Sequence, residues 1–267
     1  MGGVFAVFAC LILLKKGAGN RLRVASLLVF SISLILLLLA SGTYHAFEPG
    51  IGKQIFRRLD YACIYLLIAG TGTPIHIILF RGWWRWGMLT FIWTFAVLGL
   101  IFTVSALDFL PDYVPLTLFL MLGWSALISI FKAIRIFGFS SVQWAIWGGL
   151  FYTIGALFEV LSTPIFLPYL SNHDFFHLMV LLGAGSHWFF IYKWSDQPTC
   201  QKLIFMVKEI PNIGFLAKAR GEDISISASS KNELRQQISA LLKKRFHPAI
   251  TPQRIRFRFY TDKSINI

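Results

Sequence analysis

The chain has 267 residues, of which 56% are hydrophobic and only 14% are charged, and its mean hydropathy is +0.66. This composition is too apolar for an ordinary soluble domain and predicts a protein with several membrane spans. The formal net charge is +13, and the three cysteines lack paired spacing, so neither a disulfide framework nor a thiolate metal site is indicated.

Apolar runs of membrane-spanning length recur over residues 1–194. In chain order they cover Val24–Ala46, Tyr61–Phe80, Trp83–Ala106, Val114–Ile134, Val142–Leu161 and Phe175–Trp194. An earlier run, Gly2–Leu14, is shorter than the roughly 20 residues of a full crossing. No basic residue precedes it, so we interpret it as a short first span rather than a signal peptide. These runs predict an all-α membrane bundle of seven transmembrane helices.

Basic residues collect in alternate loops between the spans. The side that also receives the C-terminus holds Lys15, Lys16, Arg21, Arg23, Arg81, Arg85, Lys132 and Arg135. The other side has fewer basic residues, and it carries carboxylates beside them. By the positive-inside rule, the first side is cytoplasmic.

The composition becomes that of a soluble protein from Ser195 onward, and residues 195–267 are expected to form a small soluble α+β C-terminal module with a basic surface. The predicted elements are a strand over Lys202–Ile210, a turn at Pro211 and Asn212, a strand over Gly214–Arg220, a helix opened by a Ser230–Glu233 capping box, and a strand over Arg254–Tyr260. The last strand alternates arginine with apolar residues, the period of a half-buried strand.

The arginine-rich face of that last strand suggests an anionic partner. Lipid headgroups at a bilayer surface are one candidate, and we expect a contact with anionic lipid there. Nucleic acid is the other candidate, but the module has neither a stacking motif nor a recognition helix, so the sequence does not favour it.

Two histidines open the last predicted span. His173 and His177 are four residues apart, so on a helix they share one face and are able to reach a single ion. Imidazoles within a membrane are uncommon, and they are candidates for a functional site. The alternative is that both rings simply lie at the headgroup level where the helix begins.

A third histidine is expected at the same depth in the membrane. His45 ends the second span, four residues after Ser41, and Asp60 opens the third span. The alternating topology brings both helix ends to the side where His173 and His177 begin the last span. Three neutral histidines and a water are the usual form of a catalytic zinc site.

Two further ionisable residues are less clearly assigned. His187 lies ten residues after His177, about 15 Å further along the helix, so it cannot bind the same ion. We interpret it as a buried histidine bonded to a neighbouring span. Glu159 lies on the same side of the membrane as the histidines, where it is either a headgroup-level residue or a proton carrier.

Four segments resemble the hemolysin III family, the bacterial branch of the progestin and adipoQ receptors, which includes the adiponectin receptors. They read ASGTYHAF, RRLDYACIYLLIAGTGTP, GGLFYTIGALFE and HDFFHLMVLLGAGSHWFFIY. The resemblance implies a seven-helix bundle in a bacterial cell membrane, with zinc held by His45, His173 and His177 and with Ser41 and Asp60 beside the metal. The chain departs from the pattern at Tyr61, where bacterial relatives usually have histidine. The receptor branch is also described with its N-terminus inside, opposite to the charge count.

Three functions fit these observations. The first is a zinc-dependent hydrolase of a lipid amide or ester, similar to ceramidases, with Asp60 as general base and Ser41 as a donor to the oxyanion. The second is a non-enzymatic sensor or receptor, or a pore-forming haemolytic protein, with a structural zinc; no ring of like charges marks a channel. The third is an adaptor that acts through the basic module.

Overall fold

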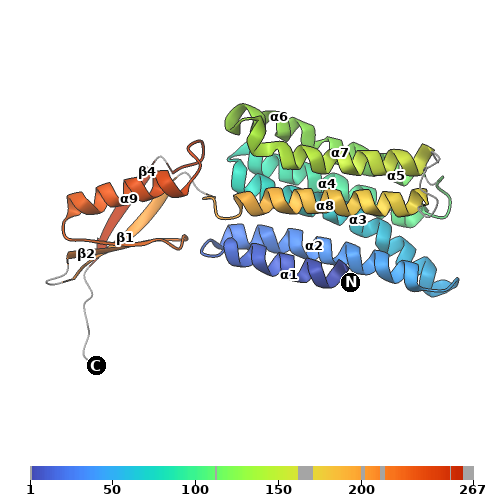
Figure 1. Ribbon diagram of the computed structural model, residues 1–267, viewed down its shortest axis with the longest axis horizontal. Helices are drawn as coiled ribbons and strands as arrows, with labels where there is room; N and C mark the ends of the chain where they lie inside the picture. The colour runs from blue at the N-terminus through green and yellow to red at the C-terminus, as the bar shows by residue number, and fades with distance from the viewer. Residues whose placement is uncertain are drawn as a thin grey trace, which may run out of the picture.

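The computed structural model describes residues 2–111, 113–161, 171–199, 202–210, 214–252 and 254–260. Its helices form an elongated bundle, and a small α+β module extends from one end of it (Figure 1). The bundle helices are α1 (Gly2–Lys16), α2 (Arg21–Ala46), α3 (Ile51–Leu79), α4 (Trp83–Ala106), α5 (Tyr113–Trp124), α6 (Ala126–Phe137), α7 (Phe139–Leu161) and α8 (Asn172–Trp194). The predicted combination of a helical membrane domain and a small C-terminal module is confirmed.

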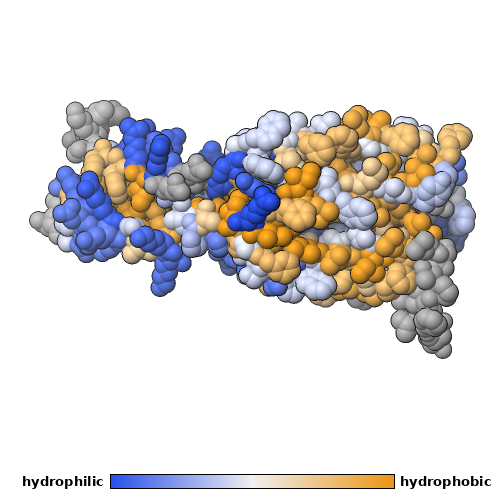
Figure 2. Space-filling view, turned by 90° about the horizontal axis from the view of Figure 1, so that it is seen from above, coloured by the Kyte–Doolittle hydropathy of each residue, from blue (hydrophilic) through white to orange (hydrophobic). Residues whose placement is uncertain are grey.

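Five segments among the described residues are long and apolar enough to cross a membrane: α2, α3, α4, α8 and the stretch Tyr113–Phe137 that holds α5 and α6. On the face shown in Figure 2, apolar side chains predominate over the bundle, whereas hydrophilic ones gather on the module. Helix α1 has only 15 residues, and α7 is not among the five. A multi-span membrane protein is therefore supported, and the number seven stays a prediction.

The predicted fifth span, Val114–Ile134, is divided into two helices. Ser125 separates α5 from α6, and its hydroxyl donates a hydrogen bond to the carbonyl of Leu122 at 2.6 Å. Such a local side-chain bond competes with the regular helical ladder, which explains the interruption. Gly138, with φ of 80°, ends α6 and lets α7 start directly after it.

Small residues bring α2 and α3 into close contact. A Cβ atom on Gly70 would lie 2.1 Å from the Oγ atom of Ser33, so only glycine permits this approach. Small residues at helix interfaces are the usual means of tight packing in membrane bundles. The contact fixes the relative position of α2 and α3, the helices that carry His45 and Asp60.

The module is a four-stranded sheet covered on one face by a helix. Its elements are β1 (Lys202–Ile210), β2 (Gly214–Ala219), β3 (Ser225–Ala228), α9 (Lys231–Arg245) and β4 (Arg254–Tyr260). The strand order is β3-β2-β1-β4, with β4 parallel to β1 and the other pairs antiparallel. Leu234, Ile238 and Leu242 on α9 pack against Phe205 and Val207 on β1, and this cluster is the core of the module.

The bounds of β1 and β4 agree with the prediction, whereas β3 was not predicted. The predicted turn at Pro211 and Asn212 lies outside the described residues. Ser230 caps α9 by accepting a hydrogen bond from the backbone of Glu233, as expected. In a capping box the Glu233 carboxylate would accept from the backbone of Ser230. Here it accepts instead from the backbone and hydroxyl of Ser229.

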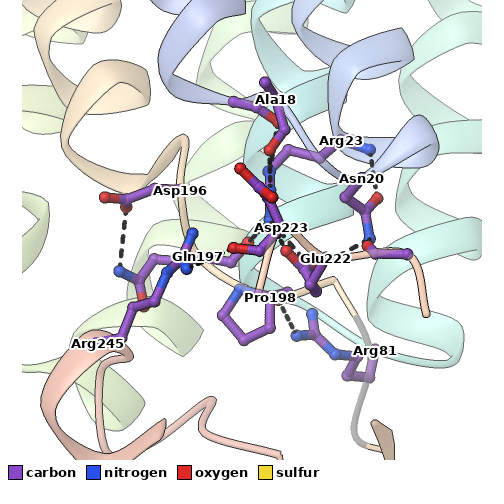
Figure 3. A network of polar contacts seen from close by, with 12 residues as sticks. Ala18, Asn20, Arg23, Arg81, Asp196, Gln197, Pro198, Glu222, Asp223 and Arg245 are labelled. Atoms are coloured by element: carbon purple, nitrogen blue, oxygen red, sulfur yellow. Dashed lines mark hydrogen bonds and ion pairs between the residues drawn. The ribbon is translucent and has the colours of Figure 1, made fainter. Parts of the chain in front are cut away.

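A buried ion pair docks the module onto the bundle. Arg23, at the start of α2, donates to both carboxylate oxygens of Glu222, with the shorter contact at 2.9 Å, and both side chains are fully buried (Figure 3). The amide of Asn20 donates to the same carboxylate at 3.1 Å. Burial raises the pKa of the Glu222 carboxyl above its ordinary value, and the Arg23 guanidinium counteracts that shift. Gly19, with φ of 94°, packs against the backbone of the module. A Cβ atom at this position would lie 2.7 Å from the backbone nitrogen of Asp223.

Arginine side chains of the bundle also bind the backbone of the segment that connects bundle and module. Arg23 also donates to the carbonyl of Gln197 at 2.8 Å, and Arg81 and Arg85 donate to the carbonyls of Pro198 and Thr199, each at 2.6 Å. The side chain of Gln197 in turn accepts a hydrogen bond from the backbone of His247 at 2.8 Å. The bundle and module are thus joined by a polar network rather than by a flexible tether.

Breaking the buried ion pair is expected to release the module. Arg23→Ala leaves the Glu222 carboxylate buried without its partner, which typically costs about 3–5 kcal/mol. Limited digestion with proteinase K should then cut between Trp194 and Lys202 at least ten times faster than in the wild type. Arg21→Ala, which removes an exposed arginine from the same helix turn, is the matched control. Equal cleavage rates in Arg23→Ala and wild type would contradict this account of the docking.

Candidate metal centre

The start of α8 places two histidines at the end of the bundle farthest from the module. Ser171 and Asp174 form a capping box there: the Ser171 hydroxyl accepts from the backbone of Asp174, and the Asp174 carboxylate accepts from the backbone of Ser171. This cap fixes the first turn of the helix. His173 and His177, one turn apart, then project from the same face.

The end of α2 supplies the third histidine. The Nε2 atom of His45 lies 3.0 Å from the Nε2 atom of His177 and 3.4 Å from that of His173, and the latter two atoms are 3.0 Å apart. Among the residues that the structure describes, these three histidines form a group whose ligand atoms are close enough to hold a single ion. The prediction that helix ends far apart in the chain bring His45 to His173 and His177 is thus borne out by the geometry.

Hydrogen bonding alone cannot satisfy three ring nitrogens in mutual contact. Each Nε2 atom carries either a proton or a lone pair, so at least one of the three pairs must join two donors or two acceptors. A cation that accepts all three lone pairs removes this conflict. A zinc site with zinc–nitrogen distances of roughly 2.0–2.1 Å and tetrahedral geometry separates its ligand nitrogens by about 3.3 Å, close to the separations seen here.

Glu159 on α7 contacts this cluster. Its Oε1 atom lies 3.1 Å from the Nδ1 atom of His173. A carboxylate that accepts from Nδ1–H leaves the Nε2 lone pair facing the other two histidines, which is the common arrangement behind metal-binding histidines. The sequence placed Glu159 at the same end of the bundle as the histidines, as the structure does, but its contact with His173 was missed, because it depends on how α7 is rotated against α8.

Asp60 and Ser41 form a second polar pair beside the histidines. Asp60, on α3, is only 9% exposed, and Ser41 on α2 is a polar neighbour of its carboxylate. Neither side chain belongs to the group of atoms that would hold the ion. Both line the same cavity as His45 and His177. Asp60 and Ser41, which the family resemblance places beside the metal, thus line the cavity next to the histidines and are not among the candidate ligands.

That cavity extends from the histidines into the bundle and has a volume of about 1170 Å³. Its walls come from most of the bundle helices and are chiefly aliphatic and aromatic, and His45, His177, Asp60 and Ser41 line one end of it. A cavity of this kind suits an apolar chain whose polar end lies at the histidines.

His187 lies apart from the metal cluster, as expected. Its Nε2 atom is 3.1 Å from the carbonyl of Ala145 on α7, so it is a buried histidine bonded to a neighbouring helix. Tyr61, the residue that departs from the family pattern, packs its ring against Phe119, with 6.0 Å between the ring centroids. Tyr61 therefore removes no candidate ligand.

Residues 1–188 match the protein family described as "Haemolysin-III related". The chain is 31% identical over 196 residues to Hemolysin-3 of Bacillus cereus, a match that covers 71% of this chain and 84% of the relative. It is 28% identical over 184 residues to a Hemolysin-3 homolog of Bacillus subtilis (strain 168), with 67% and 81% covered. The chain belongs to the haemolysin III-related family. The family match ends before the C-terminal module of this haemolysin III-related protein.

The donor set of this family member consists of imidazoles backed by one carboxylate, which suits zinc and other late first-row metals better than magnesium or calcium. In Glu159→Gln, His173 loses its carboxylate partner, and the metal affinity should fall about 10- to 100-fold while the stoichiometry at saturation stays unchanged. Competition with a coloured chelator on detergent-purified protein measures this affinity.

Glu48→Gln is the matched control, because Glu48 is an exposed carboxylate between α2 and α3 at the same end of the bundle. His45→Ala and His173→Ala, measured beside it, should lose the metal entirely. An affinity in Glu159→Gln equal to that of the control would show that Glu159 does not support the site.

Proposed function

We propose that this protein is an integral membrane hydrolase that uses zinc, held by His45, His173 and His177, to cleave an amide or ester bond of a lipid. The observation that carries the proposal is the convergence of three Nε2 atoms within 3.4 Å of one another beside a cavity that is apolar along most of its length. A structural ion would need the three histidines but would not need the adjoining cavity or the acid–hydroxyl pair in its wall.

A zinc ion bound by these histidines would lower the pKa of a coordinated water toward neutrality and polarise a carbonyl group. Asp60 would act as the general base that removes a proton from the attacking water. The apolar cavity would hold the acyl chain and exclude bulk water from the reacting end, which strengthens the electrostatic interactions there.

Ser41 has a single hydroxyl proton, which it would donate to the neighbouring Asp60 carboxylate while that residue is ionised. After Asp60 takes a proton, its carboxyl group becomes a donor, and the Ser41 hydroxyl is free to turn toward the developing oxyanion. The pair would thus couple proton removal to oxyanion stabilisation. Glu159 would keep His173 in the tautomer that presents Nε2 to the ion.

Asp60→Asn should lower the turnover of a long-chain fluorescent acyl amide or ester about 100-fold or more, because the general base is lost. Ser41→Ala should lower it by about 100-fold. Both variants should keep the zinc content of the wild type, measured by mass spectrometry, and Glu48→Gln should keep both zinc and activity. Full hydrolysis by metal-free His173→Ala would contradict the proposal.

A pore is the second candidate, favoured by the name Hemolysin-3 of the Bacillus cereus relative. In such a pore any zinc would be structural and would take no part in conduction, so folded, metal-free His173→Ala would release a trapped dye from vesicles at the same rate as the wild type. A receptor or sensor with a structural zinc would show neither hydrolysis nor release. The chiefly aliphatic and aromatic walls of the cavity favour lipid binding over ion conduction.

We also infer that the chain crosses the membrane seven times, with α1 and α7 added to the five long apolar segments and with α5 and α6 counted as one crossing. Basic residues around Arg23, Arg81 and Arg135 lie at the module's end of the bundle and support a cytoplasmic module. A fluorescent protein fused after Ile267, which folds only in the bacterial cytosol, should therefore be bright, and a periplasmic alkaline phosphatase fused there should be inactive. The reverse result would overturn this orientation.

A further inference from the structure

The face of the module's sheet that α9 does not cover carries a row of arginines. Arg254, Arg256 and Arg258 on β4 are exposed and point to this face, because their neighbours Ile255 and Phe257 pack toward the core on the other side. The strand register adds Lys202 beside Arg254 and Lys218 in the same cross-strand row as Arg258. No acidic residue of the described strands points to this face.

Strand β4 also forms an edge of the sheet. Among the described residues it pairs with β1 alone, so one side of its backbone has hydrogen-bonding groups without a strand partner. None of Arg254, Arg256 and Arg258 forms an ion pair within the described part of the chain. Such an edge is a template on which another extended chain adds as a strand.

The opposite face of β4 is aromatic and only partly covered, with the Lys231 Nζ atom 5.0 Å from the centroid of the Phe259 ring and the Arg235 Cζ atom 6.0 Å from that of Phe257. Phe259 is 52% exposed, and Phe257 is half-buried beside it. An incoming strand would therefore meet arginines on one face of the sheet and phenylalanine on the other. Single-stranded nucleic acid would satisfy the arginines but would leave Phe259 exposed, and only Tyr260 offers an exposed ring on the arginine face.

The direction of the strands distinguishes between two partners for the arginines, a protein chain and a bilayer surface. The segments that touch the bundle precede β1 and β4 and follow β2, so β1 and β4 run away from the bundle (Figure 1). From Lys202 to Lys208 strand β1 extends by about 20 Å away from the bundle. This is more than twice the distance of about 8 Å over which salt screens electrostatic attraction at physiological ionic strength. The row of arginines thus extends away from the membrane. Lipid contact by the module stays a prediction for its bundle-facing end.

We propose that β4 binds an extended segment of a partner protein in which acidic and apolar residues alternate, and that this segment adds to the sheet as a fifth strand. Alternate residues of a strand repeat every 6.6–6.8 Å or so, so successive carboxylates face Arg254, Arg256 and Arg258 in register. Arginine and carboxylate form paired hydrogen bonds. The intervening apolar residues cover Phe257 and Phe259, which gives the site a preference for pattern as well as charge.

The test uses the full chain in nanodiscs of zwitterionic phosphatidylcholine and a fluorescent peptide in which four glutamates alternate with three valines. A second peptide has the same composition with the glutamates grouped together. A third has the alternating sequence with every backbone amide nitrogen methylated, which removes the strand donors on both edges. Fluorescence anisotropy should show at least ten-fold tighter binding of the first peptide than of the other two.

The matched variants are Arg256→Glu and Lys244→Glu, both charge reversals at exposed positions of the module, the second on α9 away from the edge. Arg256→Glu should weaken binding of the alternating peptide about ten-fold or more, because one attractive cross-strand pair becomes repulsive, and Lys244→Glu should leave it within two-fold. Size-exclusion chromatography and thermal melting confirm that both variants fold.

Three results would overturn the proposal. Equal binding of the alternating, grouped and methylated peptides would show a non-specific attraction for acidic chains. Displacement of the peptide by an equal concentration of oligothymidylate, or by vesicles of anionic lipid, would show that the surface takes nucleic acid or headgroups. Absence of binding by all three peptides would show that the arginines only protect an exposed edge from aggregation.

Discussion

Three imidazole nitrogens must be held within a few tenths of an ångström of a common geometry, although they come from helix ends that are 128 residues apart in the chain. No local sequence pattern imposes this, so the packing of α2 against α3 and of α7 against α8 has to do it. The Gly70–Ser33 contact fixes the first pair, and the bond from Glu159 to His173 links the second pair to the site. The candidate metal centre therefore depends on the packing of four helices, α2, α3, α7 and α8.

The cavity and the cluster make different demands on the same helices. Helix α2 reads ILLLLA immediately before its last turns, and these last turns carry the polar residues Ser41 and His45. Helix α8 shows the opposite order at this end of the bundle, because His173, Asp174 and His177 precede its apolar stretch LMVLL. Because the two helices run in opposite directions, both polar ends meet on one side of the membrane, and the middle of the bundle stays free for an apolar ligand.

Sequence patterns predicted those features that depend on residues close together in the chain. The bounds of β1 and β4, the N-cap at Ser230 and the three histidines followed from spacing and alternation. The short strand β3, which reads Ser-Ile-Ser-Ala, was missed because it is brief and half of it is serine. The number of membrane crossings was harder to predict, because Ser125 interrupts one apolar run through a local hydrogen bond.

Contacts between distant residues could not be predicted in the same way. Arg23 was counted from its position as one of several basic loop residues, yet in the structure it is fully buried against a carboxylate that lies 199 residues further along the chain. Glu159 was assigned to the correct end of its helix, but the helix rotation that turns it toward His173 has no signal in a single sequence. Both cases involve a charge whose partner is supplied by tertiary structure.

The buried Arg23–Glu222 pair has a consequence for biosynthesis. While the chain is being made and inserted, Arg23 stands at the end of the first helix hairpin as an unpaired positive charge, available to direct the orientation of α1 and α2 in the membrane. Its carboxylate partner leaves the ribosome only when the last strands of the module have been made. In the orientation proposed above, a single arginine would thus serve first as a topological signal and afterwards as the buried partner of Glu222 that holds the module on the bundle.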